Sequence, residues 1–233
     1  MATRLQVGSE NPPMPDAPRS KPLKRPTQAR SKFTVQAIYD AFVRIWTDHG
    51  WEGVTTRAVA LETGIAVGTL YDYFPNKEAL LSGYVRHCVD ALLIRLDEQV
   101  IAPSDLVWPA RVQRLVRITC DTRLDGLPAV DHEMLMLEHR VAEPRHHRRV
   151  YSELCDRWER AFAACTDLQP QPSSAAVHAL LSAVWGARRY RLLVQPEAGG
   201  DEWVGEMEAM VMARLATHLC AAPTRTPAAS RDR

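Results

Sequence analysis

Apolar side chains recur every three or four positions through most of the chain, and Gly or Pro interrupts the stripes. In the first stripe, Phe33, Ala37, Ala41 and Ile45 follow i, i+4 spacing, with Ile38, Phe42 and Trp46 beside them. Glycine is scarce and β-branched residues show no sustained alternation, so the pattern predicts an all-α fold. About nine helices are expected, at residues 33–48, 55–63, 66–74, 77–100, 105–124, 129–142, 144–166, 173–195 and 201–220.

Both ends of the chain depart from this pattern. Six prolines and few apolar residues fall within the first 27 positions, which predicts a disordered arm over 1–27. The last residues, PTRTPAASRDR, predict a disordered tail over 223–233 in the same way. We place a first helical domain at 28–80 and a second at 81–222.

Two short helices joined by a tight turn dominate the first domain. Gly64 suits the left-handed residue that ends a helix, and Ile65 is placed for the apolar contact that follows such an end. After Pro75, Asn76 is a good N-cap for the next helix. A longer helix followed by two such helices predicts a helix-turn-helix, although the spacing alone fits a plain helical hairpin equally well.

The residues around this turn resemble the TetR family of transcriptional regulators. The strings GWEGVTTR (50–57), GIAVGTLYDYF (64–74) and NKEALL (76–81) follow the family signature in unbroken register over about residues 30–85. The resemblance implies that 28–80 binds double-stranded DNA and that 81–222 binds a small-molecule effector and dimerises. It further implies a repressor that its effector releases from a palindromic operator.

The resemblance also implies which residues contact DNA. The two threonine hydroxyls at the start of the first short helix suit phosphate, or they cap that helix. Arg57, one residue further on, can reach the base edge of a guanine, or it contacts phosphate or solvent. The full set is Thr55, Thr56, Arg57, Val67, Gly68, Thr69, Tyr71, Tyr73 and Lys77.

Neighbouring positions in the second short helix refine this expectation. Leu70 and Phe74 are expected in the core, and Asp72 is expected to face away from the groove. Ala66 stands where the family usually has Ser or Thr, and the missing side-chain cap costs about 1 kcal/mol.

The formal net charge of +1 conceals an uneven distribution along the chain. Residues 17–33 contain six basic and no acidic residues, whereas residues 34–100 contain five basic and nine acidic ones. We therefore expect the arm, through Lys24, Arg25 and Arg30, to follow phosphates or to enter a minor groove. The alternative is a solubilising tail.

Two faces of the 173–195 helix differ in side-chain size. Large residues such as Leu181 and Val184 lie on one face, and small residues such as Ala183 and Gly186 lie broadly opposite. A helix that is apolar on both faces must be covered on both, with the large residues facing inward and the small ones facing a partner helix. We therefore expect a homodimer through 173–195 and 201–220.

An effector pocket is harder to locate from sequence, because each candidate is also an ordinary core residue. Arg188 could meet an anionic or polar ligand or form a salt bridge. The candidates are Cys88, Leu92, Cys120, Met134, Leu137, Leu154, Trp158, Leu181, Trp185 and Arg188.

Other functional classes find less support. The five cysteines are scattered without CxxC spacing, so no metal site or disulfide framework is expected, and a thiol-based redox sensor remains an alternative. No HExxH or marked catalytic pair is present, so we expect no enzyme and no cofactor. No apolar run is long enough for a membrane span and no secretory signal is evident, which predicts a cytoplasmic protein.

Overall fold

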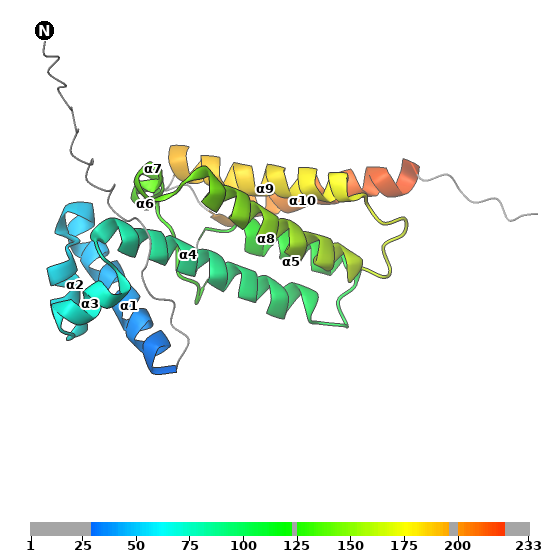
Figure 1. Cartoon of the computed structure of the whole chain (residues 1–233). Coiled ribbons are helices and arrows are strands. Elements are labelled where there is room, and N and C mark those ends of the chain that lie inside the picture. The colour runs from blue at the N-terminus through cyan, green and yellow to red at the C-terminus, as the bar shows by residue number, and fades with distance from the viewer. Residues whose placement is uncertain (1–28, 123–124, 196–199, 222–233) are drawn as a thin grey trace, which may run out of the picture. The chain divides into compact units, whose positions relative to one another are not determined.

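The computed structural model describes residues 29–122, 125–195 and 200–221, which are mostly helical and contain no strand (Figure 1). The all-α prediction is therefore confirmed for the described chain. The helices are α1 Ala29–Gly53, α2 Thr56–Thr63, α3 Val67–Tyr73, α4 Lys77–Leu96, the π-helical turn η1 Asp97–Ile101, α5 Trp108–Cys120, α6 His132–Met136, α7 Glu138–Val141, α8 Pro144–Ala163, α9 Ser174–Val194 and α10 Gly200–Ala221.

The structure corrects one sequence prediction. The single helix expected over 129–142 is wrong, since α6 and α7 are separate, and the described helices therefore exceed nine. At the break, the Leu137 carbonyl accepts from Arg140 N at 2.9 Å, a tight turn that interrupts the α-helical register. The helix expected over 33–48 does end near Gly50, whose φ of 61° and ψ of −167° are non-helical, and α1 then resumes for a short stretch to Gly53.

The chain divides into two compact units, one up to Ala79 and one from Leu80 onwards. In the first, α2 packs against α1 and α3, and their apolar faces share a core that includes Ile38, Phe42, Leu70 and Phe74, each at most 1% exposed. The expected burial of Leu70 and Phe74 is thus confirmed.

Local signals in the first unit act as the sequence predicts. Gly64 is left-handed at φ 73° and ends α2, and the following Ile65 N donates to the Ala60 carbonyl at 3.0 Å. The Asn76 side chain accepts from Ala79 N at 2.7 Å, which caps α4. Ala66 precedes α3 without any side-chain cap, as its sequence implies.

The long helices of the second unit lie along roughly the same axis and alternate in direction (Figure 1), and α5 packs against α8, α9 and α10. The core includes Leu115, Leu154, Trp158 and Leu181, each at most 1% exposed. The indole Nε1 of the buried Trp158 donates to the Thr119 hydroxyl at 3.2 Å. The only polar atom of this ring therefore has a hydrogen-bond partner within the core.

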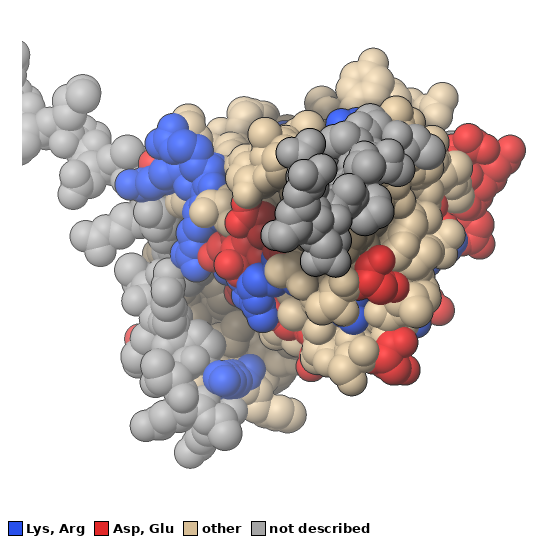
Figure 2. Space-filling view, turned by 90° about the vertical axis from the view of Figure 1, so that its right-hand side faces the viewer, with Lys and Arg blue, Asp and Glu red and all other residues tan. Residues whose placement is uncertain are grey.

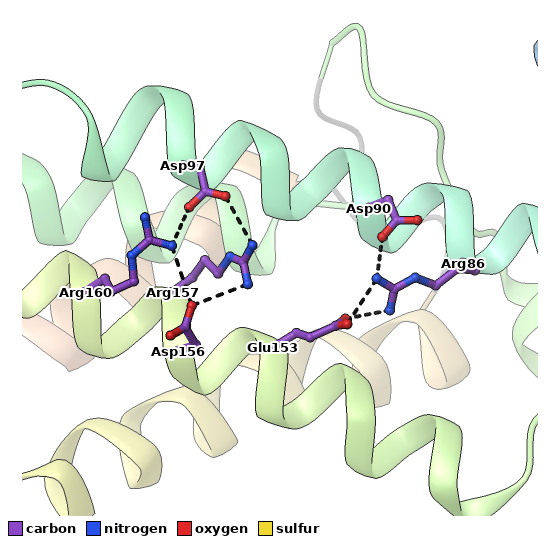
Figure 3. Close-up of polar contacts among 7 residues, drawn as sticks. All are labelled: Arg86, Asp90, Asp97, Glu153, Asp156, Arg157 and Arg160. Atoms are coloured by element: carbon purple, nitrogen blue, oxygen red, sulfur yellow. Dashed lines mark hydrogen bonds and ion pairs between the residues drawn. The ribbon is translucent and has the colours of Figure 1, made fainter. Parts of the chain in front are cut away.

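On the face drawn in Figure 2, Lys and Arg side chains gather towards the left and centre with acidic side chains beside them, and further Asp and Glu side chains lie on the right. Two groups of ion pairs join α8 to α4 and η1 (Figure 3). In one, Arg86 contacts both Asp90 and Glu153; in the other, Asp97 accepts from Arg157 and Arg160. These contacts fix α8 against the preceding helical segment.

Candidate functional site

The exposed face of α3 is the most distinctive surface of the first unit. Val67, Gly68, Thr69 and Tyr71 are all exposed, whereas Leu70 between them is fully buried. One side of this short helix therefore anchors it, and the other presents two apolar side chains, a hydroxyl and bare backbone to solvent. Such a helix is narrow enough to enter a DNA major groove.

The hydroxyls at the start of α2 have different partners. Thr55 caps the helix by accepting from Ala58 N at 3.0 Å. Thr56 instead lies 3.2 Å from the phenolic oxygen of Tyr71, which links the first turn of α2 to the exposed face of α3. The two predicted contact regions thus lie together, and Arg57 is exposed beside them.

Two other predicted contact residues have partners within the protein. The Tyr73 hydroxyl lies 3.1 Å from the Ser31 hydroxyl of α1. Lys77 Nζ donates to the Trp51 carbonyl at 3.3 Å and lies 4.2 Å from the centre of the Trp51 ring. Both side chains therefore help to position the helices, a role that the sequence did not indicate.

The basic arm can be located only in part. Lys24 and Arg25 lie outside the described residues, and so does the side chain of Arg30, although its backbone belongs to α1.

The two faces of α9 differ in burial as well as in side-chain size. Val177, Leu181 and Val184 are buried, whereas Ala183 and Gly186 are exposed within the single chain. A Cβ at Gly186 would meet no atom within 4 Å. The chain thus presents a surface of small residues along α9.

A small pocket, partly open to solvent, lies in the second unit. Residues of α4, of α9 and of the segments that follow α5 line it: Cys88, Val89, Leu92, Asp121, Thr122, Leu127, Pro128, Ala129, Val130, Trp185 and Arg188. The Tyr84 hydroxyl donates to the Ala129 carbonyl at 3.1 Å and holds one wall against α4.

Four of the predicted pocket residues line this cavity, namely Cys88, Leu92, Trp185 and Arg188. The other six do not: Cys120, Leu154, Trp158 and Leu181 belong to the packed core, Met134 is buried in α6, and Leu137 is half-buried beyond it. The sequence missed the wall at 127–130, because an irregular segment has no periodicity, although Gly126 and Pro128 did predict a break there.

Burial controls the chemistry of the thiols. It raises the pKa of Cys88 and of Cys120 to about 12, despite the nearby Arg188 guanidinium, and that of Cys165 to about 11. A thiol with so high a pKa is protonated at neutral pH and reacts slowly with oxidants. This disfavours a redox sensor built on Cys88, Cys120 or Cys165.

Two other kinds of feature are absent from the described residues. No group of His, Cys, Asp or Glu among the described residues could hold a metal ion. None of the described helices is long and apolar enough to cross a membrane.

Comparison with known proteins adds independent information. The family of bacterial regulatory proteins called the tetR family matches residues 38–83. The HTH-type transcriptional repressor KstR of Mycobacterium tuberculosis is 42% identical over 74 residues, which cover 29% of this chain but only 34% of that protein. KstR of Rhodococcus jostii is 31% identical over 152 residues, covering 64% of this chain and 67% of the repressor.

A solved structure extends the likeness in fold to most of the chain. A putative TetR-family transcriptional regulator from Mesorhizobium loti superposes with a TM-score of 0.59 at 16% identity, covering 83% of this chain and 98% of its own. This likeness concerns the fold of both helical parts.

Proposed function

The chain belongs to the tetR family of bacterial regulatory proteins, and on this basis we propose that it is a sequence-specific DNA-binding transcriptional regulator. In this proposal it acts as a homodimeric repressor that a small molecule releases from a palindromic operator. The observation that carries the proposal is the exposed face of α3, where Val67, Gly68 and Thr69 are open to solvent while Leu70 anchors the helix.

The local chemistry supports a division of roles. Thr55 and Thr56 lie at the N-terminus of α2, where free backbone N–H groups and hydroxyls suit phosphate oxygens. Val67 and Tyr71 on α3 suit base edges or the thymine methyl, and Arg57 suits guanine. Tyr73 and Lys77 would contact the DNA backbone while keeping their hydrogen bonds to Ser31 and Trp51. The arm would add phosphate contacts through Lys24, Arg25 and Arg30.

The dimer and the effector complete the mechanism. Two copies joined through the small-residue face of α9 and through α10 would present two α3 helices to adjacent half-sites. An effector bound in the pocket of the second unit would favour a spacing of these helices that fits the operator poorly.

Selection of bound DNA from a random pool tests this function. We expect a two-fold symmetric sequence whose half-site centres lie about one helical turn apart. As a control, the double variant Val67→Ala/Tyr71→Ala should recover no enriched sequence while keeping the helical content of the wild type. Absence of any enriched sequence with the wild type would refute the proposal, and loss of binding on mild oxidation would favour the thiol-sensor alternative.

A further inference from the structure

Two arginines of the second unit, one buried and one half-buried, have close polar partners. Arg111 is 2% exposed, and its guanidinium donates to backbone carbonyls that include Val100, Pro103 and Leu106. Arg86 is half-buried and contacts the carboxylates of Asp90 and Glu153 (Figure 3). In both cases the fold itself supplies the oxygens that compensate the lost hydration of the cation.

Arg188 differs from these arginines. Its only hydrogen bond runs from Nε to the Asp121 carbonyl at 3.5 Å, a long contact, within residues 29–122, 125–195 and 200–221. In the same ranges no Asp or Glu side chain forms an ion pair with it. Burial lowers the pKa of Arg188, which means that its surroundings solvate the charge poorly.

The geometry around Arg188 leaves its outer donors available. The guanidinium carbon lies 5.1 Å from the centre of the Trp185 ring, so the ring holds one side of the group. Within the described residues, neither terminal amino group of Arg188 donates a hydrogen bond. These donors belong to a side chain that lines the pocket.

The rest of the pocket is largely apolar. Val89 and Leu92 of α4 lie on one wall, and Leu127 and Val130 of the irregular segment lie on another. Asp121 also lines the pocket, and its negative charge acts against a ligand with more than one negative charge. A singly charged group with a compact apolar body fits these walls better than a phosphate does.

We propose that this pocket binds a small carboxylate, whose two oxygens accept hydrogen bonds from the Arg188 guanidinium while its apolar part packs against Val89, Leu92 and Trp185. The planar fork of arginine matches a carboxylate in two parallel hydrogen bonds. This proposal rests on the proposed function, since it names the chemical class of the effector.

Isothermal titration calorimetry of the full-length protein with hexanoate and phenylacetate, and with hexanamide and phenylacetamide, tests the inference. The amides keep the shape of each acid but lack its charge. We expect the wild type to bind at least one carboxylate about 10-fold or more tightly than its amide, because hydrogen bonds between charged groups are the stronger ones. Arg188→Gln should abolish this preference, and Arg188→Lys should retain part of it.

Arg191→Gln is the matched control. Arg191 lies on the same helix and stacks on Trp203 at 4.7 Å, but it does not line the pocket, so this variant should keep the wild-type preference. Wild-type protein that binds neither carboxylate at millimolar concentration, or that binds acid and amide equally, would overturn the inference even if Arg188→Gln failed to fold. A retained preference in folded Arg188→Gln would also overturn it.

The same samples separate this inference from the proposed function. Titration without DNA reports the carboxylate site alone, and a shift assay with the selected DNA reports regulation. Carboxylate binding without any DNA binding would support the carboxylate site and refute the proposed DNA-binding function. DNA binding without a carboxylate preference would support that function and refute the carboxylate site.

Discussion

Lys77 Nζ donates to the Trp51 carbonyl at 3.3 Å and lies over the Trp51 ring, so the first residue of α4 holds the last turn of α1. A cation at a helix N-terminus lies in an unfavourable place, because the helix dipole is positive there. The ring and the carbonyl offset that penalty, and two further ammonium protons are left for a phosphate.

Lys77→Met therefore tests both roles. We expect the free energy of unfolding to fall by about 1 kcal/mol, measured in urea, because the cation–π contact and the hydrogen bond are lost. The slope of log affinity for DNA against log salt should also become shallower by about 0.9 per protomer. Lys77→Arg should keep most of the stability and most of the salt slope. An unchanged slope in Lys77→Met would mean that Lys77 contacts only Trp51 and not phosphate.

Gly68→Ala separates folding from recognition. A Cβ at Gly68 meets no atom within 4 Å, and alanine favours helix, so stability should stay level or rise by up to about 1 kcal/mol. Affinity for the selected DNA should nevertheless fall about 10-fold, because the methyl group would enter the space of a closely approaching DNA surface. Gly200→Ala, also open at its Cβ, is the control, and equal affinity of Gly68→Ala would contradict a close approach.

Removal of residues 1–26 addresses the basic arm. The deleted segment contains Arg19, Lys21, Lys24 and Arg25, so DNA affinity should weaken and the salt slope should become shallower by up to about 4 per protomer. Shift assays at several salt concentrations measure both quantities. Unchanged affinity and slope would leave the arm as a solubilising tail.

Gly186→Arg tests the proposed dimer surface. The position is exposed on α9 and open in the single chain, so the monomer should keep its helicity by circular dichroism. A charged side chain between two closely packed helices should shift sedimentation from dimer to monomer. Gly186→Ala should remain dimeric, and a dimeric Gly186→Arg would place the interface elsewhere.

The ion pairs between α4 and α8 predict a pH dependence. Burial would raise the pKa of Glu153, but hydrogen bonds from Arg86 (Figure 3) and from Arg149 outweigh it and hold the pKa of this carboxyl below its usual value. A depressed carboxyl pKa stabilises the fold above the unfolded pKa, and this stabilisation is lost as the pH falls through the folded one.

Glu153→Gln should accordingly unfold about 1 kcal/mol more easily than the wild type at pH 7, and the difference should shrink below pH 4.5. Urea unfolding at a series of pH values measures it. Asp156→Asn is the control, because that side chain is 55% exposed and its ion pairs contribute little. A difference that persists unchanged in acid would assign the effect to packing.

The sequence by itself determined the helices, the turn and the family. Helical periodicity located most elements to within a few residues, and Gly64 and Asn76 specified an end and a start through their own backbone and side-chain chemistry. These signals are local, since each depends on residues within about one helical turn. The residues that we propose to face DNA were predicted from the same short strings.

Only the tertiary structure decided which apolar and charged residues serve a pocket or a core. Phe33 continues the first apolar stripe yet is 78% exposed, while Trp158 and Arg188, both pocket candidates, separate into a packed core and a pocket wall. Likewise, Lys77 meets Trp51 and Tyr73 meets Ser31 across tens of residues. Helical spacing states which side chains share a face, but what covers that face depends on how distant helices pack against it.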